Sequence, residues 1–178
     1  MARICVYCAS SNRVAERYLT LASQVGAELA RRGHALVTGG GRVSMMGAVA
    51  SAARAGGAHT VGIIPRALVD REIADIGADD LVVVDTMRER KAQMESRADA
   101  FLTLPGGIGT MEELFEIWTA KTLRLHDKPV VVLDHEGFFH PLWTFVEGLV
   151  DTRFMRNAAY EALTIVDSVG AALDAVEA

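Results

Sequence analysis

The chain has 178 residues, of which 51% are hydrophobic, so it can bury one substantial core but is too short for two ordinary domains. Its formal net charge of −5, from 18 basic and 23 acidic residues, argues against a broad nucleic-acid-binding or membrane-binding surface. No apolar run approaches the roughly 18 residues that span a bilayer, and a strand-like run at residues 4–7 follows the start without a signal-peptide pattern. We therefore expect a single cytoplasmic domain over residues 1–178.

Short β-branched runs alternate with alanine-rich helical segments along the chain. The expected strands lie near residues 3–8, 35–38, 60–64, 81–84, 100–104 and 129–133, with a seventh near 163–166. This alternation predicts an α/β fold: a single-domain, Rossmann-like, doubly wound parallel sheet of about seven strands with helices on both faces. Ligands of such sheets bind outside the carboxyl ends of the strands, so a site is expected in the loops that follow strands.

The first of these loops, residues 8–12, follows a strand that carries Cys5 and Cys8. Their C-x-x-C spacing is typical of redox and metal sites, but that motif normally opens a helix. Side chains three residues apart on a strand point to opposite faces, and no further Cys or His lies nearby to complete a metal site. We interpret both cysteines as buried structural residues.

The second loop, Gly39–Gly47, precedes an alanine-rich helix and forms a second candidate cradle for an anion. Its spacing does not match the dinucleotide G-x-G-x-x-G pattern, and the next strand, 60–64, does not end in an acidic residue that could hold a ribose. Neither glycine loop is followed by the Lys-Ser or Lys-Thr of a triphosphate site. A nucleoside monophosphate fits better, and we expect no cofactor.

Residues 67–80 have no clear pattern and form either a surface lid or a simple loop. The segment that follows the fourth strand, 87–94, is helix-forming and basic for an acidic protein. Arg90 and Met94 share one helical face, as do Lys91 and Glu95. Two interpretations stay open: a solvated face with a surface Lys91–Glu95 pair, or a helix that brings the Arg90 guanidinium to a ligand.

The most informative segment is Leu104–Glu113, in which a glycine-rich turn joins a buried strand to a helix. The glycines at 106, 107 and 109 are expected to allow positive φ and close approach of backbone N–H groups to an anion, with Thr110 as the helix cap. If the helix starts at Thr110, Glu113 lies at the edge of an apolar arc centred on Phe115 and Trp118. Glu112 then lies on the polar side, as a surface acid.

Together these motifs resemble those of the Lonely Guy family of cytokinin-activating phosphoribohydrolases. The matching segments are Ala9–Ser11, Gly39–Gly47, Met87–Lys91 and the P-G-G-x-G-T-x-x-E pattern of Pro105–Glu113. The chain departs from the family's G-G-G-x-x-G-L-M-G pattern in having Ser44 for the fourth glycine and Met45 for leucine, which affects loop shape and the base pocket more than the reaction. The resemblance implies hydrolysis of N6-modified adenosine 5′-monophosphates, with AMP a weaker substrate, to free base and ribose 5-phosphate.

Transferred by position, the resemblance implies that Glu113 and Arg90 are the catalytic pair. Arg90 would either orient Glu113 and the ribose hydroxyls or stabilise charge on the departing base. The residues implied to bind substrate are Ser10, Gly40, Gly41, Met46, Lys91, Met94, Gly106, Gly107, Gly109 and Thr110. The resemblance also implies a homodimer with composite active sites, built in part from the helix that carries Phe115 and Trp118.

Two alternatives and a negative expectation complete the sequence analysis. Related Rossmann-like proteins with similar glycine loops carry a phosphorylated pterin cofactor without turnover, and such a carrier would tolerate loss of Glu113. A pyridoxal-dependent decarboxylase is a weaker alternative, because the lysines at 91, 121 and 128 lack the context of a Schiff-base site. The histidines at 126, 135 and 140 lack metal-ligand spacing, so we expect no metal.

Overall fold

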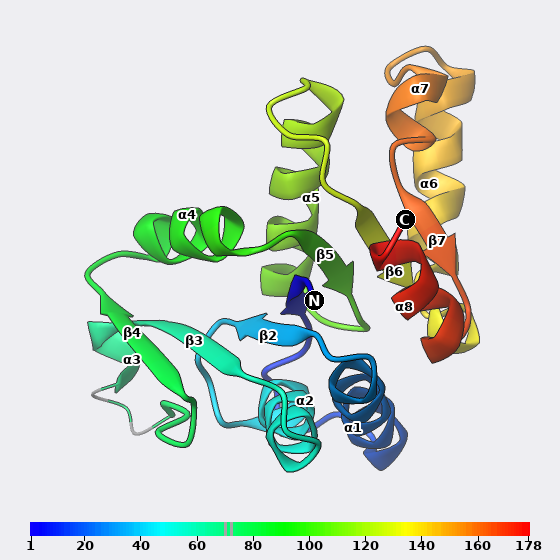
Figure 1. Ribbon diagram of the computed structural model, residues 1–178. Coiled ribbons are helices and arrows are strands. Elements are labelled where there is room, and N and C mark those ends of the chain that lie inside the picture. The colour runs from blue at the N-terminus through cyan, green and yellow to red at the C-terminus, as the bar shows by residue number, and fades with distance from the viewer. Residues whose placement is uncertain (70, 72) are drawn as a thin grey trace.

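Seven parallel strands form one sheet in the computed structural model (Figure 1), which describes residues 1–69, 71 and 73–178. The strands are β1 (Arg3–Tyr7), β2 (Ala35–Thr38), β3 (Thr60–Pro65), β4 (Asp80–Val84), β5 (Ala100–Thr103), β6 (Val130–Leu133) and β7 (Thr164–Val166). Their order is β4-β3-β2-β1-β5-β6-β7 and every pairing is parallel. The order reverses between β1 and β5, where such folds bind ligands. The predicted α/β class is confirmed.

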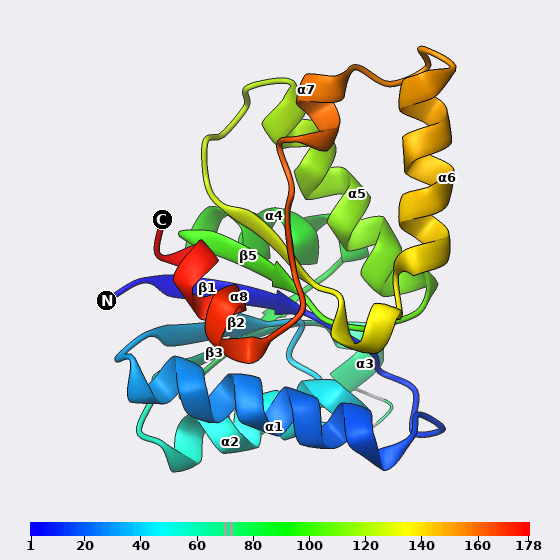
Figure 2. The ribbon, with the colours of Figure 1, turned by 90° about the vertical axis from the view of Figure 1, so that its right-hand side faces the viewer.

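Helices cover both faces of the sheet (Figures 1 and 2). On one face lie α1 (Glu16–Arg31), α2 (Ser44–Ala55) and α8 (Val169–Val176), and on the other lie α4 (Met87–Arg97), α5 (Ile108–Thr122) and α6 (His140–Asp151). The short elements α3 (Arg66–Val69), η1 (His135–Gly137) and α7 (Asn157–Tyr160) lie in the connections. Over the described residues, the helices are too short or too polar to cross a bilayer.

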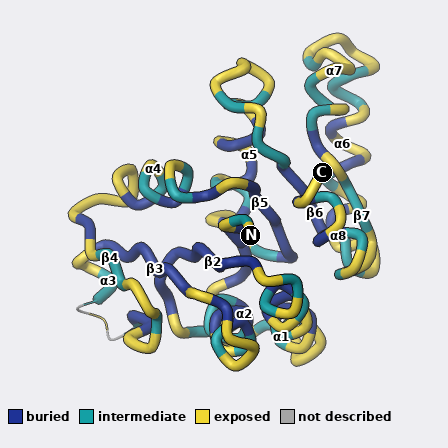
Figure 3. Tube along the Cα trace, in the orientation of Figure 1, coloured by how far each residue is buried: buried dark blue, intermediate teal, exposed yellow. Residues whose placement is uncertain are grey.

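The side chains of β1 show how the strand pattern builds two cores. Ile4 and Val6 pack with α1, α2 and α8, whereas Cys5 and Tyr7 pack with α4, α5 and α6. Both layers exclude water from the central strands, which are dark blue in Figure 3. Cys8 belongs to the first core and Cys5 to the second, and both are buried free thiols, so the prediction of structural cysteines on opposite faces is confirmed.

The segment 67–80 includes Asp70 and Glu72, which lie outside the described residues. Its later part is bonded to the second glycine loop: the Arg42 amide donates to the Ile73 carbonyl, and the Asp75 amide donates to the Gly40 carbonyl, both at 2.8 Å. A bridge between Gly41 and Ala74 lies between these two bonds. Residues 73–75 therefore form a strap against the loop that precedes α2.

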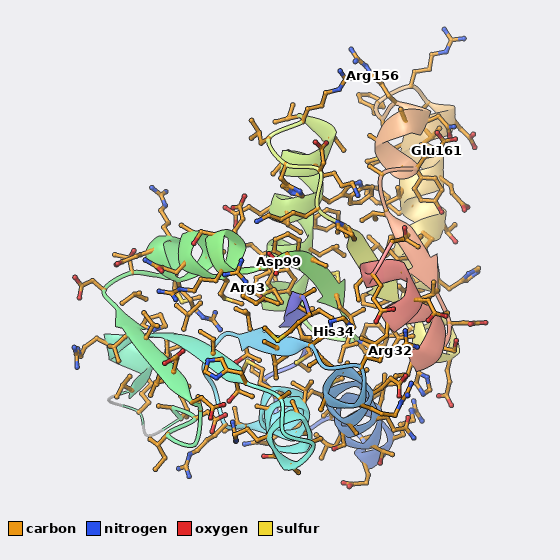
Figure 4. All side chains as sticks on the ribbon, viewed as in Figure 1. Arg3, Arg32, His34, Asp99, Arg156 and Glu161 are labelled. Atoms are coloured by element: carbon orange, nitrogen blue, oxygen red, sulfur yellow. The ribbon has the colours of Figure 1, made fainter. Side chains whose placement is uncertain are left out.

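Polar side chains join the elements at the amino ends of the strands, opposite the carboxyl ends (Figure 4). Arg3 forms a two-pronged ion pair with Asp99, which precedes β5. Arg32 and His34, which flank the turn between α1 and β2, both reach the end of α8, where Glu177 accepts from each. These contacts hold the two chain termini at one end of the sheet, away from the loops that follow the strands.

Candidate active site

A cleft of about 500 Å³ opens at the carboxyl ends of β1 and β5, where the strand order reverses. Its wall comes from the loop after β1, the starts of α1, α2, α4 and α5, and the loop after β6. The lining residues are Cys8, Ala9, Ser10, Ser11, Val14, Tyr18, Met45, Met46, Met87, Arg90, Pro105, Gly106, Gly107, Ile108, Gly109, Thr110, Glu112, Glu113 and Phe138. Eight of the twelve residues singled out in the sequence thus lie around one cavity.

The glycine motif forms the floor of the cleft at the start of α5. A Cβ atom on Gly107 or Gly109 would meet no atom within 4 Å, so these positions leave open space beside the first amides of the helix. Those amides have no partner within the helix, and the helix has no side-chain cap, so they are available to an anion. Gly106 has a packing role instead, since a Cβ there would lie 2.5 Å from Cβ of Thr110.

Two local predictions for this motif were wrong. The helix starts at Ile108, and its cap position is Gly107, so Thr110 lies in the first turn and is 4% exposed. Gly107 has an extended backbone, and positive φ occurs at none of the three motif glycines. The reason is that the turn is extended, so its glycines provide space, as Gly106 does for Thr110, and need no left-handed backbone.

Arg90 enters the cleft from α4 through a channel made by the second glycine loop. Its Nε donates to the Ile63 carbonyl at 3.1 Å, and its Nη2 donates to the Gly39 carbonyl at 3.0 Å. A Cβ on Gly39 would lie 1.6 Å from Nη2, so the absence of a side chain there lets the guanidinium pass. The third nitrogen, Nη1, lies 3.5 Å from Oε1 of Glu113.

Glu113 is enclosed, as its place on the predicted helix indicated. Its side chain is 12% exposed, against 54% for Glu112, which confirms the expected difference between the two acids. Burial raises the pKa of Glu113 from its ordinary value of 4.5 to about 7, and the Arg90 charge opposes this effect. The effect of burial on this pKa is larger than that of Arg90, because the Arg90–Glu113 ion pair is long at 3.5 Å. A carboxyl group with this pKa can gain or lose a proton near neutrality, as acid–base catalysis requires.

The second glycine loop packs between β3 and the start of α2, next to the cleft. Gly40, with a φ of +70°, packs against Ile63 and Ile64, and a Cβ on Gly41 would lie 2.8 Å from the Met46 methyl group. Gly40 and Gly41 are therefore not part of the lining, whereas Met46 is. Their small size brings the start of α2 close to the sheet.

Ser44, which replaces a family glycine, has a φ of +54°. Left-handed backbone of this kind is what the glycine of the pattern would favour. The Ser44 hydroxyl donates to the Ser11 carbonyl at 2.7 Å, which ties α2 to the loop after β1.

Two predicted residues of α4 lie outside the cleft lining. Met94 is 1% exposed and packs in the core between the sheet and α5. Lys91 extends across to α5 and pairs with Glu112 and Glu116, so of the two open interpretations the surface pair with Glu95 is not the one the structure has. Two carboxylates from the neighbouring helix outcompete the single one on the same helix, because they bind the ammonium group together.

Several lining residues carried no signal in the sequence. Tyr18 and Phe138 meet edge to face, with ring centroids 5.8 Å apart, although they come from α1 and the loop after β6. Val14 also lines the cleft and lies outside the recognised motifs, whereas Met87 and Ile108 lie within two of the motifs without having been assigned to the site. Tertiary folding brings these apolar side chains together, so their shared position could not be predicted from the sequence.

The described residues form neither a cluster of metal ligands nor a lysine site for a Schiff base. Among them, no three His, Cys, Asp or Glu side chains form a group that could hold a metal ion. His126 Nε2 lies 3.0 Å from the Ile117 carbonyl, in a local structural contact. The lining contains no lysine over the part of the chain that is described, which removes the nucleophile that a pyridoxal-dependent decarboxylase needs.

The fold is shared with solved structures of carriers. A molybdenum cofactor carrier protein from Chlamydomonas reinhardtii superposes with a TM-score of 0.75 at 23% identity, covering 99% of this chain and 96% of that one. A molybdenum cofactor binding protein from Rippkaea orientalis gives a TM-score of 0.74 at 19% identity, covering 99% and 95% of the two chains. At these identities the likeness shows a common fold.

Sequence comparison defines the family. Residues 46–176 match the profile of the family described as "Possible lysine decarboxylase". A cytokinin riboside 5′-monophosphate phosphoribohydrolase of Mycobacterium tuberculosis is 55% identical over 172 residues, which cover 97% of this chain and 91% of the relative. An enzyme of the same name from Arabidopsis thaliana is 44% identical over 157 residues, covering 88% and 74%. The chain therefore belongs to the Lonely Guy family of cytokinin riboside 5′-monophosphate phosphoribohydrolases.

Proposed function

We propose that this chain hydrolyses the N-glycosidic bond of N6-modified adenosine 5′-monophosphates, releasing the free base and ribose 5-phosphate. The observation that carries the proposal is the enclosed Arg90–Glu113 pair, which faces the same cleft as the uncapped start of α5. The relatives named above, at 55% and 44% identity, support the same reaction.

The phosphate is proposed to bind at the start of α5. Gly107 and Gly109 leave room for an anion beside backbone amides, and the helix dipole adds a favourable field. Thr110 and Ser10 line the same cleft and contribute hydroxyl groups. Holding the phosphate fixes the ribose relative to Glu113, so binding energy from a remote group supplies the orientation of the reacting bond.

Glu113 is proposed to act at the sugar. Cleavage of a ribosyl N-glycosidic bond builds positive charge at C1′, which a nearby carboxylate stabilises, and the same carboxylate can orient or deprotonate the attacking water. Its pKa of about 7 allows it to accept a proton at physiological pH. Arg90, fixed by two backbone carbonyls, holds the carboxylate in place and supplies positive charge toward the ribose or the departing base.

The base is proposed to lie against the apolar part of the cleft. Met46, Tyr18 and Phe138 supply sulfur and aromatic surface suited to a flat purine. An apolar N6 substituent would bury further surface there, which explains why AMP is expected to be the weaker substrate.

A homodimer with composite sites is part of the proposal. Ile108 is 90% exposed and Met87 49% exposed, although both line the cleft, and Phe115 on α5 is 38% exposed. Apolar side chains at the mouth of a site are what a second subunit would cover. Lys91, Met94, Gly40 and Gly41 are retained as supporting residues of the site, because they flank the lining.

A carrier that binds a phosphorylated pterin cofactor is the second candidate. The solved carriers share the fold at 23% identity or less, so their likeness gives no information about chemistry. A carrier needs no enclosed acid beside an arginine, whereas burial of Glu113 raises its pKa and disfavours its charged form. The presence of such a group favours the enzyme.

Chromatography of products from N6-isopentenyladenosine monophosphate, AMP and the dephosphorylated riboside tests the proposal. We expect base release from the monophosphates, fastest with the isopentenyl compound, and at least about a hundredfold loss in Glu113→Gln and Arg90→Ala. Asp151→Asn, which makes the same change at an exposed position on α6, is the control. Tight nucleotide binding by the unmodified protein without base release would favour the carrier.

A further inference from the structure

Lys91 lies behind the proposed catalytic acid and does not line the substrate cleft. Its ammonium group reaches from α4 to α5, where it pairs with Glu112 and lies 2.7 Å from Oε2 of Glu116. Its side chain is 17% exposed, whereas those of its two partners are 54% and 52% exposed. The pairs therefore place an enclosed cation beside the residues that flank Glu113 on its own helix.

A small cavity is lined by both Lys91 and Glu113. It has a volume of about 10 Å³ and is lined by Tyr7, Lys91, Glu95, Glu113, Glu116 and Ile117. Glu113 lines both this cavity and the substrate cleft, whereas Lys91 lines the cavity alone. Lys91 is therefore placed to act on Glu113 from outside the cleft.

The titratable groups around Glu113 come from three parts of the fold. From α4 come Arg90, Lys91 and Glu95, and from α5 itself come Glu112 and Glu116. From β1 and its following loop come Tyr7, Cys5 and Cys8, and burial raises the pKa of each of these three, so they stay neutral. Arg90 donates hydrogen bonds to two backbone carbonyls and has no ion pair with Glu112 or Glu116. Lys91 is therefore the cation that offsets the two flanking acids.

We propose that Lys91 is a positioning residue for Glu113: its ammonium group pairs with the Glu112 and Glu116 carboxylates, holds them away from Glu113 and offsets their charge. This inference rests on the proposed function, since it assigns Lys91 a part in the same reaction. Lys91 acts through Glu113 and makes no contact with the substrate.

Electrostatics gives the direction of the effect. Burial raises the pKa of Glu113, and Glu112 and Glu116 raise it further, while Arg90 and Lys91 lower it. Removing Lys91 takes away a charge that lowers the pKa of Glu113, and it also frees two carboxylates that raise it. Both effects raise the pKa of Glu113. We expect the pKa of Glu113 to rise by about one unit, and activity on the acidic side of the pH profile to fall about tenfold.

The test is the pH dependence of kcat and kcat/KM for the full chain with N6-isopentenyladenosine monophosphate. In Lys91→Met we expect the acidic limb to move to higher pH, while KM at high pH stays within about twofold. Lys91→Arg should retain the profile of the unmodified protein. Lys91→Met combined with Glu112→Gln and Glu116→Gln should restore it, because the acids that Lys91 offsets are then neutral. Lys121→Met, which removes a lysine near the end of α5, is the control for net charge.

Carboxyl ¹³C NMR of the ligand-free protein gives a readout independent of turnover. The Glu113 resonance is identified by its loss in Glu113→Gln, and its titration should move upward in Lys91→Met and return in the triple variant. An unmoved titration with an unmoved acidic limb, or a rise in KM at every pH, would overturn the inference and make Lys91 a structural residue or a substrate ligand. Absence of base release by the unmodified protein would instead overturn the proposed function, while the titration still tests Lys91.

Discussion

At the scale of single residues, Gly39 is the position where a single added methyl group should disturb Arg90 directly. A Cβ atom there would lie 1.6 Å from Nη2 of Arg90, so Gly39→Ala must displace the guanidinium and break its bond to the Gly39 carbonyl. We expect kcat/KM to fall by at least about a hundredfold, and stability to fall by about 1–3 kcal/mol, because a charged group loses a buried partner.

Steady-state kinetics and urea unfolding check this prediction. Gly148→Ala is the matched control, since Gly148 lies inside α6 with no atom within 4 Å of an added Cβ. That variant should be more stable by about 0.5–1 kcal/mol, because alanine is the better helix former. Unchanged activity in Gly39→Ala would mean that Arg90 does not need its observed position.

Glu113 should make the protein less stable as the pH rises. Burial raises its pKa from 4.5 to about 7, so the folded state holds the proton more tightly than the unfolded state does. The resulting stability is fully present below about pH 4.5 and is lost as the pH rises through 7. Glu113→Gln lacks this term, so its free energy of unfolding relative to the unmodified protein should rise by about 2 kcal/mol between pH 5 and pH 8.

Urea denaturation at several pH values checks the linkage. A constant difference between the two proteins from pH 5 to pH 8 would show that Glu113 has an ordinary pKa. Asp151→Asn, at an exposed site on α6, is the control for removal of one carboxylate.

At the scale of elements, the sequence predicts the positions of the strands well and the structural roles of individual glycines poorly. All seven strands were expected, because β-branched runs between turn residues mark buried parallel strands. The start of α5 was misplaced by two residues because Gly107 carries no side chain that signals a cap. Gly39 and Gly107 look alike in sequence, yet one admits Arg90 and the other leaves space beside free amides. Such differences depend on neighbours far along the chain.

The strap at residues 73–75 should control the order of the second glycine loop. Asp75 is buried and accepts from Nη1 and Nη2 of Arg54 at 2.7 and 3.1 Å, which anchors the strap to α2. Asp75→Asn removes the negative charge, so Arg54 loses its ion pair, at a cost of about 1–3 kcal/mol. The amides of Arg42 and Asp75, whose hydrogen bonds join the strap to the glycine loop, should then exchange hydrogen faster.

Hydrogen exchange followed by NMR checks this element. The Met111 amide, which donates to the Gly107 carbonyl at the start of α5, should keep its protection and serves as the internal control. Because Met45 and Met46 follow the loop and line the cleft, KM should rise more than kcat falls. Unchanged exchange at Arg42 and Asp75 would show that backbone bonds alone hold the strap.

At the scale of the whole molecule, the two ends of the sheet have separate tasks. The carboxyl ends of the strands surround the cleft, whereas the amino ends carry the polar contacts that join the chain termini. At the carboxyl ends, the unpaired amides at the start of α5 and the enclosed Glu113 reduce stability, but the proposed reaction requires them. Packing and ion pairs at the other end supply stability that does not depend on the site.

Arg32 tests this separation, because it joins α1 to α8 far from the cleft. Its guanidinium is 15% exposed and contacts carboxylates of Glu28, Asp174 and Glu177. Arg32→Ala should loosen α8, which packs Leu173 into the core, and should lower Tm by about 3 °C or more. Arg31→Ala is the matched control: its side chain is 69% exposed and its partner Glu28 lies on the same helix, so Tm should change by about 1 °C or less. Both variants should keep kcat/KM at 25 °C, because the sheet lies between α8 and the site's catalytic helices. Loss of activity in Arg32→Ala below its Tm would show that the two ends are coupled through the sheet, and that stability at the amino ends is a condition of the geometry around Glu113.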